Sequence, residues 1–166
     1  MLIRGLFLDI GDTIVVEEEG KSLNDMSGDL VEGAKAFLQE MSRRFALVIV
    51  SNTVNSYAVD IDQLLKKLGL RQYFSHIVTS LDVGIAKPEP GIFEAALKMS
   101  GFKPSEVIMI GDRVDTDVLG ANRMGICSIL LRWRERHPLQ ILTQKHKPAF
   151  IARSLQEVRD FIDTRG

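Results

Sequence analysis

The sequence has one cysteine, one tryptophan, no long apolar run and almost no net charge. Cys127 alone cannot form an internal disulfide or a cysteine-based zinc site, which favours a reducing compartment. No apolar run approaches the roughly 20 residues that a membrane-spanning helix needs. The residues from Met1 to Gly5 also lack the basic and then apolar layout of a signal peptide. We therefore expect a cytoplasmic protein.

The sequence has no internal repeat and no low-complexity linker. Its 166 residues, 45% hydrophobic content and net charge of −1 are typical of an ordinary globular domain with a sizeable core. We therefore predict a single domain over residues 1–166.

Short apolar runs alternate with amphipathic segments along the chain. The apolar runs predict strands over residues 2–8, 45–50, 77–79, 107–110, 126–131 and 149–151. Helices are expected over residues 30–43, 57–68, 90–100, 116–124 and 155–162, the first capped by Asp29. Strands that alternate with helices predict an α/β fold, a three-layer Rossmann-like arrangement around a parallel sheet of five to six strands.

Two segments lack this periodicity. Residues 13–28 are polar and are expected to form a solvent-exposed flap, in which the acidic triplet 17–19 is interpreted as solvated surface. Residues 134–148 have no clear pattern, so no structure is predicted for them.

Polar residues follow four of the predicted strands. They are Asp9 and Asp12, Ser51 and Asn52, Lys87 in the loop after residues 77–79, and Asp112, Asp115 and Asp117. The carboxyl ends of parallel strands meet at one edge of a sheet, which is where ligands bind in open α/β folds. Carboxylates from two strands can hold Mg²⁺ together with phosphate and water. A lysine and a hydroxyl suit the other oxygens of a phosphate. The set therefore indicates phosphoryl transfer.

These motifs resemble those of the haloacid dehalogenase superfamily of phosphatases and phosphotransferases. The first motif is similar to Asp9 to Thr13, and the second to the apolar strand that ends at Ser51-Asn52. The third resembles Lys87 to Pro90, and the fourth Ile110 to Asp117. Each motif alone is weak, but four in order at strand ends are strong evidence. The resemblance covers nearly the whole chain.

The resemblance implies a role for each matching position. Asp9 would be the nucleophile that forms an aspartyl-phosphate. Mg²⁺, the implied cofactor, would be held by Asp9, the backbone carbonyl of Gly11 and Asp112. Asp117 would support the metal waters or orient Lys87.

The phosphoryl group would be bound by side chains from the second and third motifs. The resemblance assigns this role to Ser51 and Lys87, with Asn52 nearby, and counts Lys87 among the catalytic residues. The short spacings from Asp9 to Ser51 and from Ser51 to Lys87 leave no room for the family's lid domains. We therefore expect a fold without a sizeable cap domain and an open site.

One residue departs from the family pattern. Family phosphatases usually carry a second aspartate two residues after the nucleophile, as general acid and base, and this chain has Gly11 there. Metal binding through the Gly11 carbonyl can survive, but acid–base help, typically worth about 10²–10⁴-fold, is in doubt. Asp12 is one position further on and is the alternative candidate for this role.

The end of the chain is basic. Residues 132–166 carry eight Lys or Arg and four Asp or Glu, among them Arg132, Arg134 and Arg136 around Trp133. A nucleic-acid patch is one reading, but Glu135 interrupts the segment and Trp133 is its only aromatic for stacking. A solvated surface is the favoured interpretation, and His137 is assigned to structure or surface.

The leading prediction is a Mg²⁺-dependent phosphatase or phosphotransferase that acts on a phosphorylated small molecule or macromolecule. A non-catalytic module that binds Mg²⁺, phosphate or a protein is the alternative, supported by Gly11. A dehalogenase is less favoured because the family's dehalogenases carry a lid. A receiver domain has its acceptor aspartate after the third strand, so the order here excludes it. Membrane and nucleic acid are disfavoured as partners, and a second copy of the chain is an open alternative.

Overall fold

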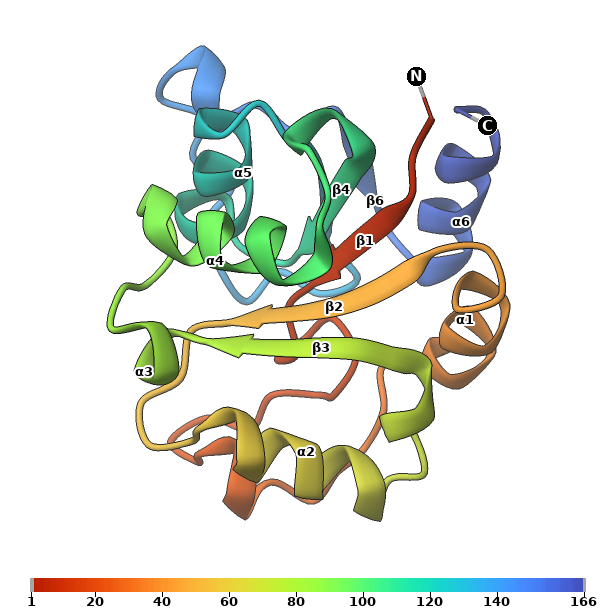
Figure 1. Ribbon diagram of the computed structural model, residues 1–166, viewed down its shortest axis with the longest axis vertical. Coiled ribbons are helices and arrows are strands. Elements are labelled where there is room, and N and C mark those ends of the chain that lie inside the picture. The colour runs from red at the N-terminus through yellow and green to blue at the C-terminus, as the bar shows by residue number, and fades with distance from the viewer. Residues whose placement is uncertain (1, 166) are drawn as a thin grey trace.

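The computed structural model describes residues 2–165, and a six-stranded parallel sheet forms its centre (Figure 1). The strands are β1 (Gly5–Leu8), β2 (Ala46–Ser51), β3 (Phe74–Thr79), β4 (Val107–Gly111), β5 (Cys127–Leu131) and β6 (Phe150–Ala152). Their order in space is β3-β2-β1-β4-β5-β6, and every neighbouring pair is parallel. The predicted α/β fold is therefore confirmed, with six strands.

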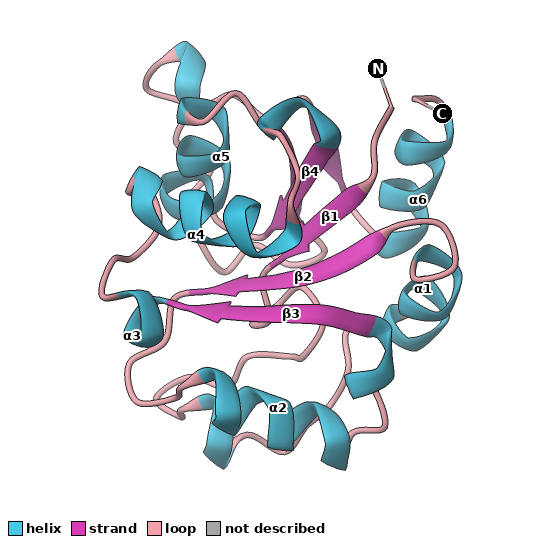
Figure 2. Cartoon of the chain, viewed as in Figure 1, coloured by secondary structure: helices cyan, strands magenta, loops and turns pink. Residues whose placement is uncertain are grey.

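Helices cover the sheet from both sides (Figure 2). They are α1 (Ala34–Met41), α2 (Ala58–Lys67), α3 (Ser80–Val83), α4 (Pro90–Ser100), α5 (Leu119–Arg123) and α6 (Leu155–Asp163). Short 3₁₀ turns lie at Leu23–Asp25, Arg71–Tyr73, Pro104–Glu106 and Gln144–His146, and one π-helical turn at Val114–Val118. In the part of the chain described, no helix is long and apolar enough to span a membrane. Within residues 2–165 there is also no large cap domain, as expected.

The central strand is buried on both faces, which explains its continuous apolar sequence. Leu6 and Leu8 of β1 pack into a cluster with α1, α2 and α6. Phe7, between them, points to the other face and packs with α4. All three side chains are fully buried, and each such burial stabilises the fold by about 1.5–3 kcal/mol.

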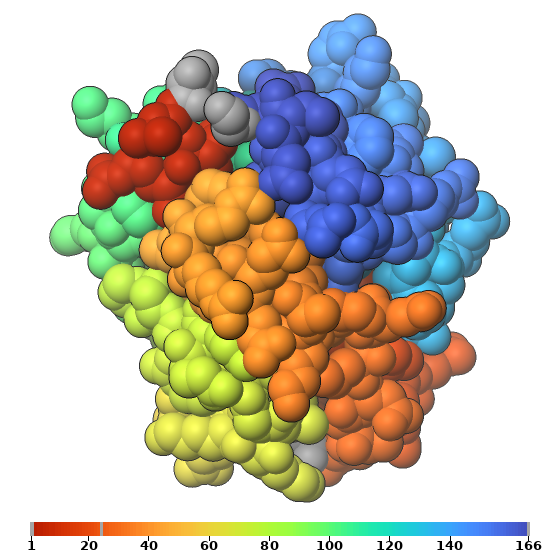
Figure 3. Space-filling model, turned by 90° about the vertical axis from the view of Figure 1, so that its right-hand side faces the viewer, coloured from red at the N-terminus to blue at the C-terminus, as the bar shows by residue number. Residues whose placement is uncertain are grey.

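An early helix and the last helix pack together on one face of the sheet. Figure 3 shows α1 lying directly against α6, and the two helices are joined by ion pairs Arg159–Glu40 and Arg44–Asp163. Segments far apart in the sequence therefore lie side by side on this face of the sheet.

Two predicted helices begin later than expected. Helix α1 begins after Gly33, not after Asp29, and the prediction that Asp29 caps it is wrong. Residues 30 and 15 instead form a bridge between extended segments, and Val16 N donates to Asp29 O. The helix expected over residues 116–124 starts as the π-helical turn, and α5 proper begins at Leu119. At α1, tertiary pairing therefore overrides the local helix signals.

Candidate functional site

The site lies where the strand order reverses, between β1 and β4. After β1 the chain adds β2 and β3 on one side, and then returns to place β4 on the other side. Ligands bind at such switch points, beyond the carboxyl ends of the strands. Asp9 follows β1, and its backbone N–H donates to Ile110 O of β4. Asp112 directly follows β4, so the sheet itself brings these two carboxylates together.

One cavity at this edge collects most of the predicted site residues. It has a volume of about 170 Å³, and its lining includes Asp9, Gly11, Ser51, Asn52, Lys87 and Asp112. Two larger hollows, of about 500 and 640 Å³, lie beside α1 and α6 and beside β5, and neither contains a predicted site residue. The chemistry of the small cavity, not its size, identifies it as the candidate site.

Lys87 is the buried cation of the site. Its side chain is 1% exposed, and Nζ donates to Asp117 Oδ1 at 2.6 Å and to Val50 O at 2.8 Å. Nζ also lies 3.4 Å from Asp9 Oδ1. Burial alone would lower the pKa of Lys87, but the carboxylates of Asp117 and Asp9 reverse this and raise it above its ordinary value. The site therefore contains a permanent ammonium group.

The neighbours of Lys87 hold it in place. The side-chain amide of Asn52 donates to Lys87 O at 2.9 Å and accepts from Lys87 N at 2.8 Å. Because both polar ends of this amide are occupied, Asn52 fixes the lysine loop against the end of β2. Gly111 is the last residue of β4, and a side chain there would collide with the Asp117 carboxylate. Its small size therefore lets Asp117 reach Lys87. Ser51 is buried at the end of β2.

A divalent cation fits the charges that remain. Lys87 serves two carboxylates, since it pairs with Asp117 and also lies 3.4 Å from Asp9. Asp112 faces Asp9 and pairs with no lysine or arginine within residues 2–165. Burial, and next the Asp9 charge, raise the pKa of Asp112 to about 9. A carboxyl group with such a raised pKa is buried beside other negative charges that are not fully compensated. A metal ion bound there would neutralise them. The oxygen donors of Asp9, Asp112 and the Gly11 backbone suit Mg²⁺.

Replacing Asp112 by Asn is expected to stabilise the metal-free protein. A raised carboxyl pKa means that the ionised form opposes folding. This cost is absent below the ordinary pKa of about 3.8 and grows as the pH rises toward about 9. At pH 8 the free energy of unfolding should rise by at least about 1 kcal/mol, the value of one pKa unit. Urea unfolding of both proteins at pH 5 and pH 8 measures this gain.

Asp112→Asn should also remove stabilisation by Mg²⁺, which the wild type gains by mass action. The gain in stability should be smaller at pH 5 than at pH 8. An equal loss of stability at both pH values would contradict the argument, because it would show that Asp112 supports the metal-free fold.

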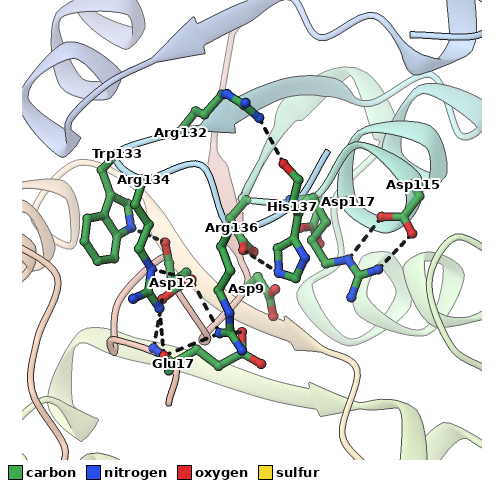
Figure 4. Close-up of polar contacts among 12 residues, drawn as sticks. Asp9, Asp12, Glu17, Asp115, Asp117, Arg132, Trp133, Arg134, Arg136 and His137 are labelled. Carbon is green, nitrogen blue, oxygen red and sulfur yellow. Dashed lines mark hydrogen bonds and ion pairs between the residues drawn. The ribbon is translucent and has the colours of Figure 1, made fainter. Parts of the chain in front are cut away.

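Asp12 lies outside the cavity lining, in a cluster with the basic segment (Figure 4). Arg134 Nε and Nη2 donate to its two carboxylate oxygens at 3.0 and 2.6 Å, and Trp133 Nε1 donates to its backbone carbonyl at 2.8 Å. Asp12 is 1% exposed, and its φ of 54° belongs to the left-handed region. Its carboxylate is used to anchor residues 133–136, and not to reach the cavity.

The interpretation of the basic segment as solvated surface is therefore wrong for three arginines. The side chains of Arg132, Arg134 and Arg136 are only 14%, 34% and 26% exposed. Arg136 pairs with both Asp12 and Glu17. The segment without periodicity folds over the flap because its charges match those of residues 12–17, a long-range pairing that no local pattern reveals.

Sequence reasoning missed two residues at the site. Glu17, assigned to solvated surface, lines the cavity. His137 places Nε2 3.5 Å from Asp112 Oδ2, and this nitrogen has no hydrogen-bond partner within residues 2–165. Burial, and then Arg113, lower the pKa of His137. Arg113 itself pairs with Asp115, whose side chain is 64% exposed, at the outer side of the cavity.

This fold and this site define a class of parallel α/β proteins with carboxylates and a buried lysine at the switch point of the sheet. The chain belongs to the haloacid dehalogenase-like hydrolase family, whose sequence model matches residues 3–125.

Two curated relatives are phosphatases by name. The chain is 30% identical over 125 residues to a glyceraldehyde 3-phosphate phosphatase of Methanopyrus kandleri, a match that covers 75% of this chain and 52% of the relative. It is 38% identical over 104 residues to a phosphoserine phosphatase of Thermus thermophilus, covering 62% and 39%. The chain thus spans about half the length, or less, of these relatives.

A solved structure matches along the whole fold. The crystal structure of an uncharacterized protein from Listeria monocytogenes serotype 4b has a TM-score of 0.79 and 26% identity, and 98% of each chain is covered.

Proposed function

We propose that the protein is a Mg²⁺-dependent phosphatase that works through an aspartyl-phosphate on Asp9. One observation carries the proposal: the Asp9 carboxylate stands at the end of the central strand, 15% exposed, between buried Lys87 and Asp112. The Asp9 carboxylate is accessible enough to attack a substrate. It lies next to the Lys87 ammonium group and to the proposed Mg²⁺ site with Asp112. The names of the two relatives support a phosphatase.

The chemistry follows from these positions. A carboxylate oxygen of Asp9 attacks phosphorus, the bond from phosphorus to the leaving oxygen breaks, and the leaving group departs with its electron pair. Lys87 and the Ser51 hydroxyl bind the other phosphoryl oxygens. Water then attacks phosphorus, the bond to Asp9 breaks, and phosphate is released.

Mg²⁺ is the metal that the donor set favours. Asp9, Asp112 and the Gly11 carbonyl would hold it, and a bound ion would neutralise charge on the phosphoryl oxygens. Asp117 would act on this centre through Lys87, which it contacts directly.

The cavity indicates what kind of phosphate ester is accepted. A volume of about 170 Å³ holds a phosphoryl group, whereas sites that enclose a small-molecule ligand usually measure about 300–1,000 Å³. The remainder of the substrate would therefore lie outside, and contribute little binding. Since no acid follows Asp9 at position 11, aryl phosphates, acyl phosphates and phosphoanhydrides should react far better than sugar phosphates.

The test is hydrolysis of an aryl phosphate and of a sugar phosphate with Mg²⁺ and with a chelator. We expect Mg²⁺-dependent release of the phenol to be at least about 10²-fold faster than release of the sugar. This factor is the lower limit of what a general acid usually contributes to the departure of a poor leaving group. Acid quenching should yield a covalent phosphoenzyme, seen by mass spectrometry. No hydrolysis of aryl or acyl phosphates with Mg²⁺ would overturn the proposal and favour the alternative of a non-catalytic binding module.

The remaining expectations are part of the same proposal. We place the protein in the cytoplasm, on the composition described above. The proposed partner is a phosphorylated substrate, small or macromolecular, and a second copy of the chain is the alternative contact at the open site.

A further inference from the structure

Another carboxylate occupies the place beside Gly11 where the usual aspartate side chain would begin. A Cβ atom on Gly11 would lie 2.9 Å from Glu17 Oε2 and 3.2 Å from Glu17 Cδ. The Glu17 carboxylate therefore adjoins the place where the usual acid–base side chain would begin. It comes from the flap, six residues later in the chain.

Glu17 is exposed to the same cavity as the nucleophile. It lines that cavity together with Asp9, Gly11 and Lys87. One of its carboxylate oxygens lies within 4.8 Å of an Asp112 oxygen, and its side chain is 35% exposed, so water can reach it.

The backbone of Glu17 is held by contacts outside the cavity (Figure 4). Its N–H donates to Asp12 Oδ1 at 2.8 Å, and its carbonyl accepts from Arg134 Nη2 at 2.7 Å. Since Arg134 also binds Asp12, one arginine fastens both ends of the turn from residue 12 to residue 17. The fold thus fixes the backbone from which the Glu17 side chain enters the cavity.

Arg136 holds the Glu17 carboxylate beside Gly11. Its Nη1 lies 3.2 Å from Glu17 Oε2, the same oxygen that would lie 2.9 Å from a Cβ atom on Gly11. The ion pair thus keeps a carboxylate at the side of the cavity where the usual acid–base side chain is missing.

We propose that Glu17 is the catalytic base for hydrolysis of the aspartyl-phosphate, in place of the aspartate that Gly11 replaces. The inference rests on the proposed function of Asp9. Water attacks phosphorus, its proton passes to a Glu17 oxygen, and the bond from phosphorus to Asp9 breaks with its electron pair returning to the Asp9 carboxylate. The proton then leaves Glu17 to solvent as phosphate departs. The leaving group of the first step departs unaided.

The experiment compares Glu17→Gln with the wild type on an activated aryl phosphate with Mg²⁺, using rapid-quench kinetics. Steady-state turnover should fall about 10²–10⁴-fold. The first turnover should persist as a burst of one phenol per protein, with the phosphoenzyme accumulating. The Mg²⁺ concentration for half-maximal burst rate should be unchanged. Glu19→Gln, an exposed neighbour in the flap, is the matched control and should behave as the wild type.

A second variant separates this role from a structural one. Glu17→Ala should lose turnover as Glu17→Gln does. Adding Gly11→Asp to Glu17→Ala should restore part of it, because the new carboxylate enters the space that the shorter side chain vacates. Unchanged turnover in Glu17→Gln would overturn the base assignment while leaving Asp9 as nucleophile. A lost burst with a raised Mg²⁺ requirement would also overturn it, and would make Glu17 a metal ligand. Absence of both hydrolysis and phosphoenzyme in the wild type would instead refute the proposed function, and the Glu17 role with it.

Discussion

Asp9→Asn is expected to lower hydrolysis of aryl phosphates by roughly 10⁴-fold or more, the scale of effect seen when a catalytic nucleophile is removed. The amide nitrogen and oxygen of asparagine are poor nucleophiles, so no phosphoenzyme should form. The fold should be retained, because Lys87 keeps its contacts with Asp117 and Val50 when Asp9 loses its charge. Initial rates with saturating Mg²⁺, together with mass spectrometry of acid-quenched samples, measure both effects.

The matched control for this variant is Asp160→Asn, which makes the same chemical change on the exposed side of α6, outside the cavity. It should leave the rate within a factor of two or so, as surface substitutions usually do. A phosphoenzyme that still forms in Asp9→Asn would assign the nucleophile to another residue. A rate that falls less than about tenfold would argue for direct attack by water on the substrate.

The residues that follow strands could be predicted because their placement depends on a local rule. Asp9 and Asp112 each follow an apolar run, and a parallel sheet must bring such ends to one edge. The helix from Pro90 to Ser100 was also predictable in full, since a proline at its first turn and Gly101 in the left-handed conformation mark its two ends. In these cases the structure at a position is determined by residues close to it in the sequence.

Glu17 and Arg134 could not be placed in this way. Their positions depend on a contact between segments more than one hundred residues apart, and a run of charges alone does not distinguish a partner from a solvated face. The bridge between residues 15 and 30 is similar, since it delays α1 by pairing two segments that have no strand pattern. The signal that was available is the missing aspartate at position 11, which directs attention to that place in the site but does not point to any residue that could fill it.

Lys87→Met is expected to be the most destabilising change at the site. Breaking a buried ion pair from one side leaves the other charge without a partner and costs about 3–5 kcal/mol. Here the abandoned group is Asp117, whose side chain is 1% exposed. Activity should be lost as well, because no ammonium group would remain beside the phosphoryl oxygens. Urea unfolding at pH 8, with Lys98→Met on the exposed face of α4 as the control, measures the loss of stability.

The cost of Lys87→Met should also depend on pH in a definite direction. In the wild type, burial raises the pKa of Asp117 to about 6 although Lys87 opposes this. Without Lys87 the pKa must rise further, so the penalty is largest above that pKa and shrinks as the pH falls and Asp117 takes up a proton. Adding Asp117→Asn should accordingly recover stability at pH 8 but not activity, since it removes the abandoned charge without replacing the ammonium group. Equal destabilisation at pH 5 and pH 8, with no recovery in the double variant, would show that Lys87 supports the fold by packing and not through its charge.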